Sequence, residues 1–319
     1  MNRKSKQFIS KLIFFFALNL VILAGLLVYF SGQQREIHLS YDETESNLLV
    51  LGEKVHYRVV LLGTSRGRVL SRDGNHTMVE QILGGRVANL SKGGGGGLMP
   101  AEVHLSWFYH QGNRSDQVIY LVDPWIFYSS INNENNNFFL RDEPFELFIF
   151  FKLIRDGYSL DRLFSYLQMI TVTDWKQISR YSAPGLTNGT LKAIDEKKTQ
   201  DARRNYLENF DRKSYIAYGP VVERINRLVR HNNGRITYVM LPLLMKDFPG
   251  LGEVDAFLRE TAAREEGMDY YNFASCMQET KWYYDHMHFN KAGIGQFLKY
   301  GILPLLEGKR PLLDNAVGP

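Results

Sequence analysis

Five short apolar runs, separated by longer amphipathic stretches, dominate the pattern of hydrophobic positions after residue 55. The runs are rich in β-branched and leucine residues with few polar breaks, which is typical of strands buried on both faces of a parallel sheet. The predicted strands lie within 58–62, 86–91, 117–123, 235–241 and 268–273, and the predicted helices within 75–83, 98–110, 220–229, 254–265 and 291–306. Strands that alternate with helices predict right-handed crossovers, and therefore a three-layer α/β/α sandwich around a parallel sheet.

The alternation is interrupted at about 125–214, where the pattern predicts a large helical insertion. Residues 144–154 and 160–170 read as helices, and an asparagine-rich loop covers 132–137. Aromatic residues gather in the first part of this segment. They could line a groove, but we favour the interpretation that they pack the insertion onto its domain.

The N-terminal segment contains an apolar run, 12–30, with no charge and one polar side chain, Asn19. Nineteen residues at helical rise cover about 28 Å, close to the roughly 30 Å of a bilayer core. A buried core helix and a cleaved signal peptide are the alternatives, but core helices are shorter and no Ala-x-Ala-like site follows the run. We therefore expect a cytoplasmic tail at 1–11, an uncleaved transmembrane anchor at 12–30, a stalk at 31–54 and one α/β domain at 55–319.

The distribution of charge indicates on which side of a membrane the domain lies. Arg3, Lys4, Lys6 and Lys11 precede the apolar run without an acidic residue, which predicts a cytoplasmic N-terminus and an extracytoplasmic domain. Without these four, 34 basic residues face 34 acidic ones, so no excess charge points to nucleic acid. The single cysteine, Cys276, cannot form an internal disulfide, which in an exported domain favours a bacterial cell membrane protein.

The first predicted strand leads into Gly63-Thr64-Ser65-Arg66-Gly67, a turn bounded by glycines that presents one serine. Open α/β sheets bind their ligands at the carboxyl ends of the strands, which is where this turn places Ser65. Such turns also occur without any chemistry. A second glycine-rich stretch, 93–97, follows the second predicted strand, and its exposed amide groups are suited to binding an oxyanion.

The segment after the fifth predicted strand contains Asp285 and His288, three residues apart before the last helix. This spacing lets the carboxylate accept a hydrogen bond from the imidazole, which then can take a proton from a serine hydroxyl. Asp285 could instead only cap the helix, and His286 could be the base in place of His288. The two histidines could also chelate zinc with Asp285, but no third imidazole or Glu-x-x-His motif is nearby, so we expect no metal and no cofactor.

The turn at Ser65, together with Asp285-x-x-His288-x-Asn290-x-x-Gly293, resembles the SGNH (GDSL-like) hydrolase superfamily. The resemblance spans roughly 55–306 without the insertion. The anchor and the Gly-Thr-Ser-Arg form resemble the extracytoplasmic branch related to DltD and to the alginate O-acetylation proteins. The resemblance implies a Ser65–His288–Asp285 triad. It also implies an oxyanion hole formed by the amide groups of Ser65 and of Gly93 or Gly94. The third donor of the family, an asparagine after the third strand, has no counterpart, because Asp123 stands there and an ionised carboxylate cannot donate.

Two functional hypotheses follow from these residues. The first is a membrane-anchored acyl-ester enzyme, either an O-acyltransferase or an esterase, acting on an acylated envelope glycan or glycolipid. An anchor with no further span would need an integral-membrane protein to deliver any acyl donor made in the cytoplasm. The second is a catalytically silent binding or assembly subunit for envelope polymer modification, which the missing asparagine and the large insertion favour.

Overall fold

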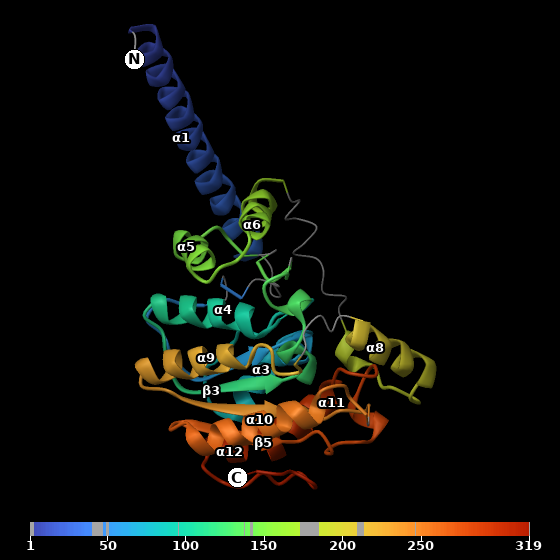
Figure 1. Ribbon diagram of the computed structural model, residues 1–319. Coiled ribbons are helices and arrows are strands. Elements are labelled where there is room, and N and C mark those ends of the chain that lie inside the picture. The colour runs from blue at the N-terminus through green and yellow to red at the C-terminus, as the bar shows by residue number, and fades with distance from the viewer. Residues whose placement is uncertain are drawn as a thin grey trace.

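The computed structural model describes residues 3–39, 47–48, 51–94, 96–136, 138–140, 143–172, 185–208, 214–245 and 247–318. A five-stranded, all-parallel sheet forms the centre of the body (Figure 1). Its strands, in the spatial order β2-β1-β3-β4-β5, are β1 (His56–Gly63), β2 (Val87–Asn89), β3 (Arg114–Val122), β4 (Arg235–Met240) and β5 (Met268–Asn272). The predicted α/β fold class is therefore confirmed, and the order is the doubly wound one of flavodoxin-like sheets.

The topological switch point lies between β1 and β3. From β1 the chain first adds β2 on one side, and it then adds β3, β4 and β5 on the other side. Gly63 at the end of β1 pairs in register with Leu121 near the end of β3. The residues that follow these two strands, Ser65 and Asp123, are consequently brought to the same edge. Ligands of open α/β sheets bind at this position.

Both faces of the sheet are covered, because side chains of each strand alternate between two hydrophobic clusters. Val60 and Leu62 of β1 belong to one cluster, and Val59 and Leu61 to the other. The first face is covered by α4 (Leu98–His110), α9 (Gly219–His231) and α10 (Leu251–Arg264). The second is covered by α3 (Asn75–Leu83) and by α11 (Lys291–Phe297), which continues through a π-helical turn (Leu298–Ile302) into α12 (Leu303–Leu306).

Within its described residues, the insertion contains the α-helices α5 (Leu147–Arg155), α6 (Leu160–Val172) and α8 (Glu196–Glu208). Apolar residues of α5 and α6 pack against the outer face of α4, around Val103 and Trp107, and against Leu27 of the N-terminal helix. The α4 helix is thus buried between the sheet and the insertion. The remaining helical elements are short: α2 (Ser65–Arg68) and 3-10 turns at Pro124–Phe127, Ser130–Asn132, Leu186–Asn188 and Thr280–Trp282.

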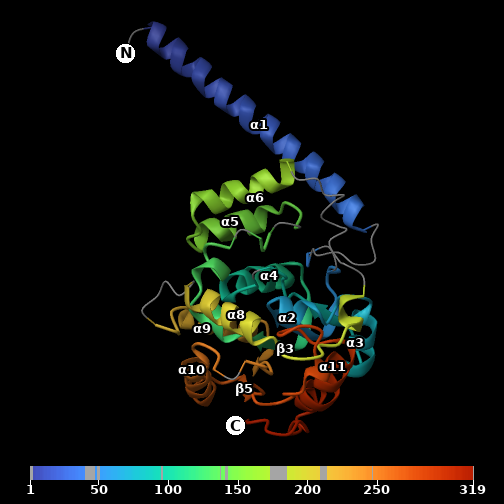
Figure 2. The same ribbon diagram turned by 90° about the vertical axis from the view of Figure 1, so that its right-hand side faces the viewer.

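The N-terminal helix α1 (Arg3–Leu39) projects from the body on the side that carries α5 and α6 (Figures 1 and 2). Its segment Arg3–Gln33 is long and apolar enough to cross a membrane, with a mean hydropathy of 2.6, and only 6% of its most apolar window is buried. This exposure separates α1 from the core helix of a soluble domain. The expected stalk begins as the continuation of α1, and most of its remainder, 40–46 and 49–50, lies outside the described residues.

Candidate active site

Ser65 is held by the turn that joins β1 to α2. Thr64 is the N-cap of α2, and its Oγ1 accepts a hydrogen bond from Arg66 N at 3.3 Å. Gly67 packs on the end of β2, since a Cβ there would lie 2.4 Å from Ser91 Oγ, and its carbonyl accepts from Asn89 Nδ2 at 3.0 Å. The need for this close approach explains the second glycine of the motif.

His288 and Asp285 reach Ser65 from a loop 223 residues further along the chain. His288 Nε2 lies 2.9 Å from Ser65 Oγ, and Nδ1 lies 2.9 Å from Asp285 Oδ2. Oδ1 of Asp285 accepts from the backbone N–H groups of Met287 and His288, both at 2.8 Å. The three side chains therefore form one hydrogen-bonded relay from a hydroxyl through an imidazole to a carboxylate.

The loop itself is fixed at both ends, so the relay has a rigid support. Tyr284 N donates to His288 O at 3.0 Å, and the Tyr284 ring stacks on the imidazole with 5.5 Å between ring centroids. Asn290, not Asp285, caps α11, because its Oδ1 accepts from Gly293 N at 2.9 Å. A Cβ at Gly293 would lie 2.0 Å from Trp282 O, which accounts for the glycine of the motif.

The electrostatics of the loop keep Asp285 ionised. Burial alone would raise the pKa of Asp285, but hydrogen bonds and charge from His288, together with the two backbone donors, lower it to about 2. An ionised carboxylate at this position favours the tautomer of His288 that carries its proton on Nδ1 and leaves Nε2 free to accept from Ser65. The pKa of His286 is lowered, mainly by burial.

Arg66, which the sequence analysis did not single out, connects the parts of the site. Its side chain is 3% exposed, and its Nη1 lies 2.6 Å from the fully buried Asp123 carboxylate. Its Nε donates to Met287 O at 3.1 Å, and its Nη2 donates to Pro242 O. The guanidinium thus links the ends of β1, β3 and β4 to the histidine loop.

Asp123 acts as an acceptor in this network, which is in keeping with an ionised carboxylate. In addition to Arg66, the Thr64 hydroxyl donates to it. Both carboxylate oxygens are therefore engaged with the nucleophile turn. The sequence alone does not single out this pair, because it depends on the register of β1 with β3.

Gly94, one of the two glycines predicted for the oxyanion hole, and Gly96 have different surroundings in the structure. Gly94 is exposed, with φ +74°, and a Cβ added there would meet nothing within 4 Å. Gly96 is buried against the nucleophile turn, where an added Cβ would lie 2.4 Å from Gly63 O and 3.2 Å from Thr64 Cα. The oxyanion role of Gly93 and Gly94 stays a prediction, and Gly96 is the glycine whose backbone closely approaches the turn.

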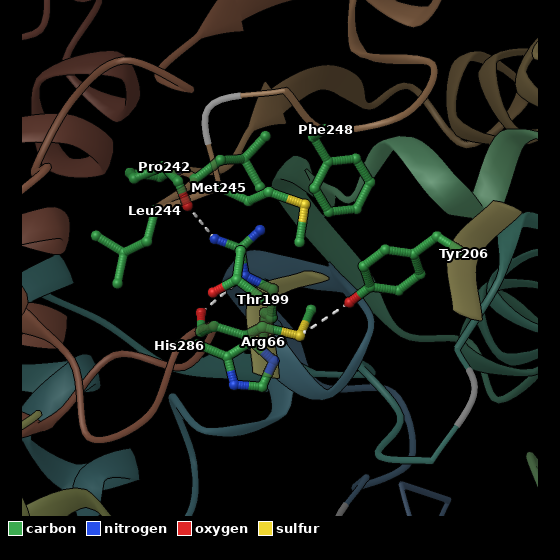
Figure 3. A pocket seen from close by; sticks show the side chains of 10 residues that line it. Arg66, Thr199, Tyr206, Pro242, Leu244, Met245, Phe248 and His286 are labelled. Atoms are coloured by element: carbon green, nitrogen blue, oxygen red, sulfur yellow. Dashed lines mark hydrogen bonds between the residues drawn. The ribbon is translucent and has the colours of Figure 1, made fainter. Parts of the chain in front are cut away.

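A small apolar pocket lies beside the relay, between the histidine loop, the segment after β4 and α8 (Figure 3). Its cavity volume of about 10 Å³ is far below the roughly 300–1,000 Å³ of ligand pockets, so it holds no more than about one water. Tyr206 of α8 forms part of the pocket wall, and its hydroxyl donates to Met287 Sδ at 3.0 Å. The ring of Tyr206 packs on Phe248 and Trp125. His286 faces this pocket, whereas His288 contacts Ser65.

No group of three or more histidine, cysteine, aspartate or glutamate side chains among the described residues is arranged to hold a metal ion. No protein-family model matches the chain, and no curated protein is significantly similar to it in sequence. Any function must therefore be argued from the geometry of the relay and its surroundings.

Proposed function

We propose that the protein is a membrane-anchored serine acyl-ester enzyme of the SGNH type, acting on an acylated glycan or glycolipid of a bacterial envelope. The observation that carries the proposal is the continuous relay Ser65–His288–Asp285, with 2.9 Å at each of its two contacts. Three side chains from distant parts of the chain meet in this order at the edge of the sheet where ligands bind. A solely structural role does not require that order.

The relay supports a two-step acyl transfer. Ser65 Oγ attacks the ester carbonyl while its proton passes to His288 Nε2, and the alcohol leaves with that proton. A second hydroxyl, from water or from a sugar, then attacks the acyl-serine carbonyl while its proton passes to His288 Nε2. The acyl group moves to this hydroxyl oxygen, and His288 returns the proton to Ser65 Oγ as the bond to the serine breaks. The N–H of Ser65, at the first position of α2, has no intrahelical acceptor and is available to the oxyanion.

The insertion favours transfer to a sugar over simple hydrolysis. The α8 helix brings Tyr206 to Met287, the residue next to His288, and forms a wall beside the relay. A transferase must keep water from its acyl-serine and position another hydroxyl there, an effect that contributes about 7–11 kcal/mol in well-oriented reactions. The rest of the described chain is occupied by the sandwich and the N-terminal helix.

The silent assembly subunit remains the second candidate, and the state of Asp123 favours it. Both oxygens of Asp123 accept hydrogen bonds, so this position cannot supply the third oxyanion donor of the family. Losing one such donor lowers rates by about 10²–10³.

Covalent labelling of Ser65 tests whether the relay activates the nucleophile. A fluorophosphonate should label the full-length protein in detergent, and Ser65→Ala and His288→Ala should abolish the labelling. His286→Ala is the matched control and should retain it. Loss of labelling in His286→Ala but not in His288→Ala would show that His286 is the base.

Turnover of p-nitrophenyl acetate then separates the enzyme hypotheses. We expect slow release of p-nitrophenol that increases when an envelope oligosaccharide is added, together with an acetylated sugar detected by mass spectrometry. Rapid hydrolysis that no glycan changes would indicate an esterase. Absence of turnover and of an acyl-serine, with glycan binding that is equal in Ser65→Ala, would indicate the silent subunit.

A further inference from the structure

The hairpin formed by α5 and α6 exposes an unusual amount of apolar surface. Twelve large apolar side chains outside α1 are exposed among the described residues, and five of them lie on these two helices. They are Leu147 (62% exposed), Phe151 (62%) and Ile154 (49%) on α5, and Leu160 (70%) and Phe164 (65%) on α6. Scattered exposed apolar residues are normal, but a group on adjacent helices marks an interaction surface.

Each helix has a second apolar face that is already used inside the molecule. Ile149 and Leu153 of α5, and Leu163 and Tyr166 of α6, are buried in the cluster that also contains Trp107 of α4. The exposed residues follow the spacing i, i+4, i+7 on α5 and i, i+4 on α6, so they form separate stripes. Folding of the body therefore does not account for the exposed stripes, and something outside it must cover them.

The contact between the hairpin and α1 sets the height of the hairpin relative to a membrane. Leu27 of α1 is buried in the cluster of the hairpin, and Ser31 Oγ donates to Phe145 O at 3.4 Å. The apolar run of α1 ends at Phe30. Leu27 is three residues before that end, or about 4.5 Å at helical rise, so the hairpin meets α1 at the end of the apolar run.

We propose that the α5–α6 hairpin lies in the lipid interface beside α1, with the exposed stripes (Leu147, Phe151, Ile154, Leu160 and Phe164) immersed at the boundary of headgroups and acyl chains. The inference rests on α1 being the retained membrane anchor of the proposed function. Both ribbon views place the hairpin on the side from which α1 projects, and the chain's C-terminal end on the opposite side (Figures 1 and 2). An interfacial helix inserts its apolar face about 5–10 Å, which matches the height fixed by Leu27.

An exposed arginine at the end of α5, Arg155, is consistent with a hairpin that lies in the lipid interface. The side chain of Arg155 is 72% exposed and follows directly after Ile154. Arginine at the membrane boundary keeps its charge among the headgroups while its stem stays apolar. Arg155 Nε lies 3.6 Å from Asp156 Oδ1, and a headgroup layer accommodates both this exposed ion pair and the apolar stripes.

The consequence for the proposed enzyme is a fixed distance between its site and the bilayer. A hairpin held at two points, by α1 and by lipid, prevents the body from swinging freely on the anchor. The substrate class that suits such an enzyme is one presented at a constant height above the membrane, such as a membrane-tethered glycan.

Depth-dependent quenching tests the proposal on the full chain in nanodiscs. Single cysteines are introduced at Leu160 and Phe151 in a Cys276→Ala background and labelled with an environment-sensitive fluorophore. Leu312→Cys is the matched control, since Leu312 is a leucine of 69% exposure on the C-terminal segment. Val21→Cys, within the apolar run of α1 and 69% exposed, reports that the anchor is inserted.

We expect spin-labelled lipid with its probe near the headgroup to quench the labels at positions 160 and 151 roughly twofold or more, and the label at 312 not measurably. Quenching at position 21 by a lipid whose probe lies deep in the acyl chain, with no quenching at 160 and 151 by the headgroup probe, would overturn the proposal. A blue-shifted but unquenched label at 160 and 151 would assign the stripes to a protein partner instead. Phe151→Asp combined with Phe164→Asp should reduce quenching at 160 and leave that at 21 unchanged. None of these readouts depends on activity, so a failure here is distinct from a failure of the proposed acyl-ester chemistry.

Discussion

The carboxylate of Asp285 makes two kinds of hydrogen bond: one orients the ring of His288, and the others hold the backbone of its own loop. One oxygen accepts two backbone N–H groups while the other faces His288 Nδ1. Replacing it with asparagine retains the size and one acceptor but presents a donor to the imidazole. The ring would then take the tautomer that carries its proton on Nε2, facing Ser65.

We expect Asp285→Asn to lower the rate of fluorophosphonate labelling by about 10⁴-fold at neutral pH, as a wrong tautomer does in serine hydrolases. The same substitution should change the pH dependence of stability. The pKa of Asp285 is lowered to about 2 in the folded protein, so its stabilising contribution is present above the unfolded pKa and is lost as pH falls toward 2. Urea unfolding should show a gap between wild type and variant that narrows from pH 5 to pH 2. A gap independent of pH would contradict this assignment.

The buried pair of Asp123 and Arg66 leads to a second prediction at this scale. Asp123→Asn removes the charge that compensates a guanidinium of 3% exposure, and unpairing a buried ion typically costs about 3–5 kcal/mol. We therefore expect a lower free energy of unfolding in urea, although asparagine is the residue that the family uses as an oxyanion donor. The double variant Arg66→Gln with Asp123→Asn should recover part of the loss. Additive losses would show that the two side chains do not act as a pair.

Among the elements, the glycine-rich loop depends on how closely two backbones approach. A methyl group at Gly96 would collide with Gly63 O and lie close to Lys92 O and Thr64 Cα, all of which are backbone atoms that cannot move alone. We expect Gly96→Ala to shift the turn of Ser65, to slow labelling and to cost about 1–3 kcal/mol of stability. Gly252→Ala is the matched control, because a Cβ on that residue of α10 would meet nothing within 4 Å. It should be neutral or slightly stabilising in the same thermal unfolding assay.

The elements also show where sequence reasoning succeeded and where it could not. The helices α3 and α4 match their predicted ranges at both ends, and each of the five predicted strands overlaps an observed one within about three residues. The α8 helix was not predicted because it has no apolar stripe and no buried residue. Five consecutive glycines are indistinguishable in sequence, so only the packing against Gly63 identifies Gly96. The Arg66–Asp123 pair likewise depends on the register of β1 with β3, which composition does not reveal.

At the scale of the whole molecule, the charges before the apolar run of α1 predict on which side of a membrane the site lies. The basic residues before the apolar run predict that the N-terminus remains in the cytoplasm. An alkaline phosphatase fused after residue 319 should therefore be active, and a green fluorescent protein that matures only in the cytoplasm should be dark at the same position. Retention of the anchor should appear as the full-length mass in the membrane fraction. A fluorescent fusion without phosphatase activity would place the domain in the cytoplasm.

The separation of 223 residues between Ser65 and His288 has a consequence during synthesis of the protein. The serine emerges from the ribosome before its base, because His288 lies 223 residues further along the chain. At 5–20 residues per second the two are synthesised roughly 11 to 45 s apart. During that interval the nascent chain carries a serine with no base to activate it. An acyl-ester chemistry built on this relay would thus be silent throughout synthesis and export, and would begin only when the final loop docks.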